Sequence, residues 1–180
     1  MSKKIDKIMD LFMEDSYRKF NVREVGRLTK LNPSTASKYL FLAAKSDMLK
    51  MEKSRNFILF SANLENRTFR DMKIYRNIKK IRESGLVEFI ENELNYPESI
   101  ILFGSYAKGE NRKDSDIDIF ILSESKKKLN LKTFEAKLKA EIQVFRHNRQ
   151  EIERIKVRSK ELLNNIINGV KLSGFFEVFI

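Results

Sequence analysis

The sequence of 180 residues contains no cysteine, no tryptophan, two prolines and a single histidine, His147. Without cysteine, disulfides, thiolate zinc sites and cysteine nucleophiles are excluded. With one histidine, a metal site built on two histidines is excluded as well, so a metal ion would need oxygen ligands. The absence of cysteine suits a reducing compartment, and we expect a cytoplasmic protein.

No apolar run approaches the roughly 18 residues that a membrane-spanning helix needs. The N-terminal segment carries acidic residues within its apolar pattern, so we expect neither a membrane span nor a secretory signal. Hydrophobic residues make up 42% of the chain and 14 residues are phenylalanine, which is enough to build a packed core.

Acidic residues are too few to balance the basic ones, since 25 Asp and Glu stand against 36 Lys and Arg, a net charge of +11. This excess favours polyanionic partners such as nucleic acid, nucleotides or a membrane surface. A basic protein without such a partner is the alternative. Residues 1–63 carry the largest share of the excess.

Residues 1–63 show the pattern of three helices followed by a β-hairpin. Apolar residues recur at helical spacing from Ile5 to Phe12, which predicts the first helix. Asn21 can cap a second helix, and Pro33 suits the first turn of a third. Two apolar runs then flank a polar turn at residues 54–56. This order of elements predicts a winged helix-turn-helix domain.

Residues 22–29 followed by 32–40 resemble the winged DNA-binding domains of archaeal and bacterial regulators. The resemblance implies that the third helix enters the major groove of double-stranded DNA. The residues presented there would be Ser34, Thr35, Ser37 and Lys38. Arg55, at the tip of the hairpin, would reach a phosphate or the minor groove. A winged helix used for protein contacts is the alternative.

Residues 64–97 are predicted to form a helical linker to a second domain at residues 98–180. In that domain short apolar strands, at 99–103, 116–122 and 141–145, alternate with helices. The apolar segment 175–180 predicts either a packed strand or a contact with a second copy, which would make a homodimer.

The segment between the first two of these strands carries the chemistry. The first strand ends at Gly104 and Ser105, where glycine permits close approach of a ligand and the amides of a helix N-terminus attract phosphate. Lys108 adds positive charge. Asp116 and Asp118 are two residues apart on a strand, so their carboxylates share a face and favour a hard cation, Mg²⁺ or Mn²⁺. Together these features describe a nucleotidyl-transfer site.

This segment resembles the nucleotidyltransferase superfamily of DNA polymerase β, and most closely its minimal nucleotidyltransferases. Their signature is Gly-Ser-x-Ala-Arg-Gly, a short loop, then Ser-Asp-x-Asp. The matching residues are Gly104, Ser105, Ala107, Gly109, Ser115, Asp116 and Asp118. Lys108 stands where the family usually has Arg, which keeps the charge but loses the planar fork.

The resemblance implies an α+β protein, in which the winged helix-turn-helix is followed by a small mixed sheet flanked by helices. It implies that Asp116 and Asp118 bind the metal ions. It also implies that an NTP, with ATP expected, is bound by Gly104, Ser105, Lys108 and Ser115.

The family has a third carboxylate on a neighbouring strand, and here the sequence departs from it. The best register places Gln143 at that position, and Gln is neutral and a poorer metal ligand. Glu141 lies two residues earlier on the same face and is the candidate replacement. Either Glu141 completes the catalytic set, or the domain binds nucleotide with weakened or absent catalysis.

Two functions therefore follow from the sequence. The first is a Mg²⁺-dependent enzyme that transfers NMP from an NTP to an acceptor, for which a separate HEPN-type partner protein is one candidate that the resemblance implies. The second is a DNA-binding regulator whose nucleotidyltransferase domain only senses nucleotide or is silent. Neither involves a membrane.

Overall fold

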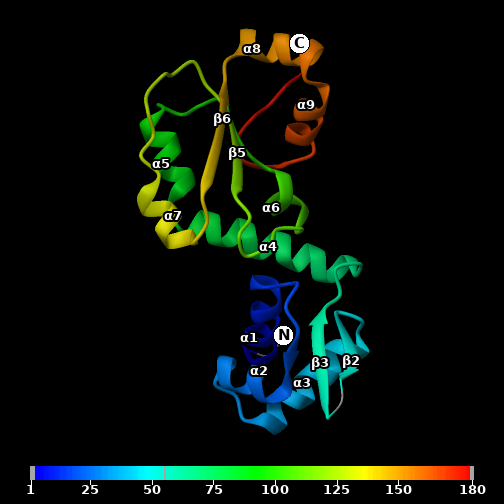
Figure 1. Ribbon diagram of the computed structural model, residues 1–180. Coiled ribbons are helices and arrows are strands. Elements are labelled where there is room, and N and C mark those ends of the chain that lie inside the picture. The colour runs from blue at the N-terminus through cyan, green and yellow to red at the C-terminus, as the bar shows by residue number, and fades with distance from the viewer. Residues whose placement is uncertain (1–2, 55, 179–180) are drawn as a thin grey trace. The chain divides into compact units, whose positions relative to one another are not determined.

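A computed structural model describes residues 3–54 and 56–178 of the chain (Figure 1). The fold is α+β, as predicted, and the chain divides into two compact units, Met1–Lys73 and Ile74–Ile180. They are called the N-terminal and C-terminal units below. In the part of the chain that the structure describes, no helix is long and apolar enough to cross a bilayer.

The N-terminal unit contains the three helices and the hairpin that the sequence predicts. Its elements are α1 (Lys3–Glu14), β1 (Phe20–Asn21), α2 (Val22–Thr29), α3 (Pro33–Lys45), β2 (Leu49–Ser54) and β3 (Phe57–Ala62). The Asn21 side chain caps α2 by accepting from the Glu24 amide, and Pro33 opens α3. The two-residue strand β1 was not predicted, and it completes an antiparallel sheet of order β1-β3-β2.

A single buried core holds the N-terminal unit together. Phenylalanines dominate it, and the rings of Phe12 and Phe20 meet edge to face at 5.1 Å. The long helix α4 (Arg67–Glu83) contains the boundary between the units, and its first turns belong to this core through Phe69. The ammonium of the buried Lys73 donates to the Ser16 hydroxyl at 2.7 Å.

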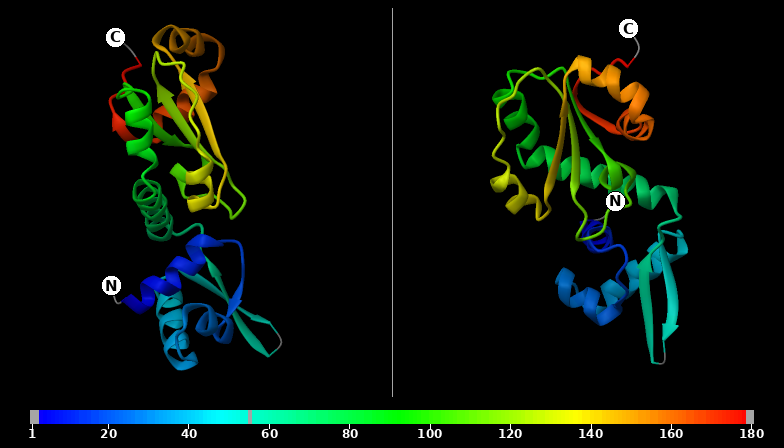
Figure 2. Two further views of the ribbon diagram at one scale, coloured as in Figure 1. Left: turned by 90° about the vertical axis from the view of Figure 1, so that its left-hand side faces the viewer. Right: turned by 45° about the horizontal axis from the view of Figure 1, so that its top comes forward.

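The C-terminal unit is a four-stranded mixed sheet between helices (Figure 2). Its elements after α4 are α5 (Leu86–Glu93), β4 (Ser99–Phe103), α6 (Gly104–Lys108), β5 (Ile117–Leu122), α7 (Lys132–Leu138), β6 (Ile142–His147), α8 (Arg149–Arg158), α9 (Lys160–Ile167) and β7 (Val170–Gly174). The strand order is β6-β5-β4-β7, in which β5 and β6 are parallel and the other pairs antiparallel.

Alternating residues of β4 and β5 bury both faces of this sheet. On one face Ile100 and Ile119 pack in a cluster with residues of α4 and α5. On the other face Ile101 and Phe120 pack with residues of α8 and α9. With both faces covered, the central strands are apolar apart from Ser99 and Asp118, which is why the sequence reveals them so readily.

The division of the chain differs from the predicted linker at residues 64–97. The boundary between the compact units lies between Lys73 and Ile74 in the chain. The cluster that includes Ile81, Leu86 and Ile90 is part of the sheet's core. A helical period shows that a helix has an apolar face, but it does not show which domain covers that face. Most of the segment predicted as a linker after residue 73 is therefore packed structure.

Smaller differences concern the last third of the chain. The helical segment after Asn148 is two helices separated at Ser159. The strand expected at residues 141–145 is observed as Ile142–His147, so Glu141 precedes it. The apolar C-terminal segment forms no strand over residues 175–178, although Phe176 packs on the ring of Phe120. The homodimer contact stays a prediction.

Candidate functional site

The turn between β4 and α6 brings the backbone directly against Asp118. Gly104 has a φ of +67°, a conformation that residues with a side chain rarely adopt. A Cβ atom built on Gly104 would collide with the Asp118 carboxylate oxygen. Phe103, the residue before the turn, is the register partner of Asp118 on β5. The positive φ therefore favours glycine here, and any side chain at this position would displace the Asp118 carboxylate.

Asp116 and Asp118 form a pair of neighbouring acids at the start of β5. Both are partly buried, and Ile117 between them points into the core. The pKa of Asp118 is raised above its ordinary value, first by burial and then by the negative charge of Asp116. Two carboxylates in this arrangement repel each other, so the site favours a cation.

The structure brings Gln143, and not a third carboxylate, to this pair. Gln143 is the register partner of Asp118 on the parallel strand β6, and its amide nitrogen donates to Asp116 Oδ2 at 2.6 Å. Glu141 is exposed and lines a shallow hollow together with Glu135 and Lys139. Among residues 3–54 and 56–178 no group of three or more acids or histidines is arranged to hold a metal ion. Glu141 is thus not placed as a third ligand.

The remaining residues predicted to bind nucleotide lie on α6 and in the loop that follows it. Ser105 is partly buried in the first turn of α6. The exposed Lys108 ammonium donates to Asn165 Oδ1 at 3.3 Å. The Ser115 hydroxyl accepts a hydrogen bond of 2.8 Å from the Arg112 amide, which stabilises the turn immediately before Asp116. Lys108 therefore lies on the surface, and the Ser115 hydroxyl stabilises the loop that leads to Asp116.

Three residues that the sequence analysis did not single out lie beside this site. They are Asn77 on α4, Tyr106 on α6 and Asn111 in the following loop. The Asn77 amide nitrogen donates to the Asn111 side-chain oxygen at 2.8 Å and to the Tyr106 carbonyl at 3.0 Å. Burial raises the pKa of Tyr106, while its hydrogen bond with Asn111 and the charge of Arg76 lower it. No spacing in the sequence marks these residues, because their partners are 29 and 34 positions away.

The DNA-binding candidates lie on the surface of α3. Ser34 and Lys38 are exposed, and Thr35 and Ser37 are partly exposed. The side chain of Asn32 caps the helix by accepting from the Thr35 amide at 2.8 Å, and it also accepts from the Ser34 hydroxyl. Among the DNA-binding candidates on this helix, Lys38 carries a charge. Arg55 lies outside the described residues.

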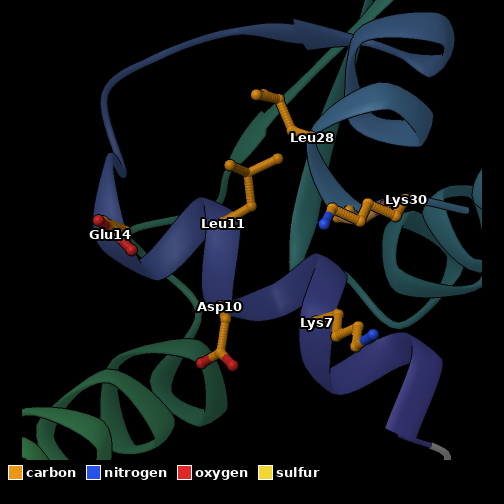
Figure 3. Close-up of a pocket in the computed structure, with 7 residues that line it drawn as sticks. Lys7, Asp10, Leu11, Glu14, Leu28 and Lys30 are labelled. Carbon is orange, nitrogen blue, oxygen red and sulfur yellow. The ribbon is translucent and has the colours of Figure 1, made fainter.

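A separate hollow in the N-terminal unit lies between α1 and the end of α2 (Figure 3). Leu11 and Leu28 contribute apolar surface to it, and Lys7, Asp10 and Lys30 bring charges of both signs to its wall. None of the DNA-binding candidates described on α3 lines this hollow.

A protein-family model matches residues within the C-terminal unit. Residues 84–170 match the family model described as the nucleotidyltransferase domain. Over this range the C-terminal unit is similar to nucleotidyltransferase domains. The match contains the Gly104–Ser105 turn, the Asp116–Asp118 pair and Gln143, and it supports nucleotidyl transfer as the general activity of the unit. Asn77 precedes the matched residues.

Comparisons with individual proteins add little. No curated protein matches the chain significantly. Among solved structures, the crystal structure of Sso10a-2, a DNA-binding protein from Sulfolobus solfataricus, aligns at 20% identity over 51% of this chain and 92% of its own. The TM-score of 0.36 is too low for that likeness to carry an argument about fold or function.

Proposed function

We propose that the C-terminal unit transfers a nucleoside monophosphate from an NTP, with ATP the expected donor, to an acceptor in a Mg²⁺-dependent reaction. The observation that carries the proposal is the contact of the Gly104 turn with the Asp116–Asp118 pair. A turn suited to phosphate and a pair of acids suited to a cation meet at one end of the sheet.

The donor set fits a hard divalent cation. Asp116 and Asp118 supply carboxylate oxygens, the ligands that Mg²⁺ and Mn²⁺ prefer. Burial, and then the negative charge of Asp116, raise the pKa of Asp118. When bound, the cation would polarise the reacting phosphate and offset the charge that develops on it. With Gln143 in place of a third acid, the pair carries one negative charge less than the family pattern.

The other residues of the site bind and orient the nucleotide. The backbone of the Gly104–Ser105 turn can approach phosphate oxygens closely because no Cβ intervenes, and the Ser105 hydroxyl can donate one further hydrogen bond. Lys108 provides a positive charge at the surface of α6. Ser115 holds the turn from which Asp116 emerges.

Transfer of label from NTP tests the enzymatic proposal. The protein is incubated with α-labelled NTPs, Mg²⁺ and candidate acceptors, both protein and nucleic acid. We expect transfer by the wild type and none by the Asp116→Ala, Asp118→Ala double variant. Asp114→Ala is the matched control, since Asp114 is an exposed acid of the same loop, and it should transfer label normally. Equal transfer by wild type and double variant would refute the assignment.

A second function is favoured by one observation, the replacement of the third carboxylate by Gln143. In this alternative the chain is a DNA-binding regulator whose nucleotidyltransferase domain binds nucleotide with little or no transfer. The surface of α3 with Ser34, Thr35, Ser37 and Lys38 would then contact the major groove.

Salt titration of binding to duplex DNA tests this alternative. A basic side chain that neutralises one DNA phosphate contributes about one to the slope of log affinity against log salt concentration. Lys38→Ala and Arg55→Ala should therefore each make the slope shallower by about that amount. Lys126→Ala, an exposed lysine in the C-terminal unit, is the control and should leave the slope unchanged. Absence of duplex binding at low salt would exclude the DNA-binding function.

A further inference from the structure

A buried hydrogen-bond network ties α4 to the nucleotidyl-transfer site. Asn77 and Asn111 are both buried, at 3% and 7% exposure. The amide nitrogen of Asn77 reaches two acceptors, the side-chain oxygen of Asn111 at 2.8 Å and the main-chain carbonyl of Tyr106 at 3.0 Å. Buried polar groups need such partners, because an unsatisfied one is costly away from water. The network is therefore a fixed feature of the folded unit.

The two acceptors belong to two parts of the site, α6 and the loop that follows it. Tyr106 follows Ser105 in the first turn of α6, so its carbonyl moves with the phosphate-binding turn. Asn111 lies in the segment between α6 and Asp116. The Tyr106 hydroxyl also forms a hydrogen bond with the Asn111 side chain. The negative charge of Asp116 is one of the causes that raise the pKa of Tyr106. One side chain from α4 thus holds both parts of the site.

We infer that Asn77 is a positioning residue, which fixes the Gly104–Ser105 turn relative to the segment leading to Asp116 at the spacing that a metal–nucleotide complex needs. The inference rests on the proposed function. It extends the site to a helix that precedes the residues matched by the family model. A purely structural role for Asn77 would stabilise the unit without changing how strongly it binds the metal–nucleotide complex.

Two variants remove parts of the network with little change in shape. Asn77→Asp replaces the donating amide nitrogen by an oxygen of similar size, which then faces two acceptors. Tyr106→Phe keeps the ring and removes only the hydroxyl that bonds to Asn111. Asn92→Asp makes the same chemical change at an exposed position on α5 of the same unit, and it is the matched control.

The readout is the affinity for a fluorescent ATP analogue, measured on full-length protein over a series of Mg²⁺ concentrations. Circular dichroism and the melting temperature establish in parallel that each variant is folded at the assay temperature. We expect Asn77→Asp to bind about tenfold more weakly, the lower end of the effect seen when residues behind a metal site are changed. Tyr106→Phe should bind more weakly by a smaller factor, and Asn92→Asp as the wild type does.

A folded Asn77→Asp variant with wild-type affinity overturns the inference. If that variant does not fold, Tyr106→Phe decides, and wild-type affinity in the folded Tyr106→Phe protein overturns it as well. Failure of the proposed function gives a different result, since the wild-type protein would then show no Mg²⁺-dependent binding of the analogue at all.

Discussion

The side chain of Gln143 donates a hydrogen bond of 2.6 Å to Asp116, from the register position on β6 opposite Asp118. The neutral amide therefore engages a carboxylate oxygen that would otherwise be available to a cation. In the nucleotidyltransferase family that the sequence resembles, a third carboxylate stands at this position. The strength of cation binding at the Asp116–Asp118 pair should depend directly on this one residue.

Gln143→Glu should convert the pair into a set of three acids. We expect Mg²⁺ or Mn²⁺ to bind about tenfold more tightly, because the added charge attracts the cation and the amide no longer engages Asp116. Without divalent cations the variant should melt at a lower temperature, since three neighbouring carboxylates repel one another, and Mg²⁺ should restore the loss. Calorimetric titration with metal and thermal melts measure both effects.

Glu141→Gln is the control for that experiment. Glu141 lies outside the Asp116–Asp118 pair, so its neutralisation should leave metal affinity nearly unchanged. A strong loss of affinity in Glu141→Gln would show that Glu141 supplies the third ligand. No gain in Gln143→Glu would contradict the dependence of cation binding on residue 143.

Gly104→Ala tests the close approach of the turn to Asp118. The alanine has to adopt an unfavourable positive φ, at a cost of about 1–2 kcal/mol. Its methyl group also displaces the Asp118 carboxylate. Gly85→Ala is a matched control, because Gly85 also has a positive φ but no atom lies within 4 Å of its added Cβ. Urea unfolding should show a loss of stability in both variants, and nucleotide binding should fail only in Gly104→Ala. Equal binding by both variants would contradict the close approach.

The raised pKa of Asp118 predicts a pH dependence of stability in the absence of metal. The folded protein holds this proton more tightly than the unfolded chain, so the contribution of Asp118 is favourable at low pH and is lost as pH rises through its folded-state pKa. Asp118→Asn should remove that part of the dependence, and its melting temperature at neutral pH should equal or exceed that of the metal-free wild type. Melts between pH 3 and pH 7 test this, and an unchanged profile in Asp118→Asn would argue against it.

The sequence predicts the parts of this molecule that are governed by local pattern. The cap at Asn21, the proline in the first turn of α3, the hairpin and the buried strands follow from periodicity and turn chemistry. The Gly104 turn and the two acids after it follow from a motif whose residues are close in the chain. The sequence places Gln143 at the position of the family's third carboxylate, and in the structure Gln143 is the register partner of Asp118.

Features that depend on contacts between distant segments were not predictable in the same way. The pairing of Asn77 with Asn111 joins a helix to a loop 34 residues later, and neither asparagine stands out in composition or spacing. The packing of α5 against the sheet was also missed, because an apolar helical face has the same pattern whichever surface covers it. The position of Glu141 was not predictable from alternation along an assumed strand, because β6 begins one residue later, at Ile142.

Binding of a nonhydrolysable ATP analogue, measured by calorimetry with and without Mg²⁺, tests the central claim most directly. The account predicts binding by the wild type that requires Mg²⁺, and no such binding by the Asp116→Asn, Asp118→Asn double variant. Binding that is equally strong without divalent cations, or that survives in the folded double variant, would contradict the claim that these two aspartates hold the cation beside the phosphate-binding turn.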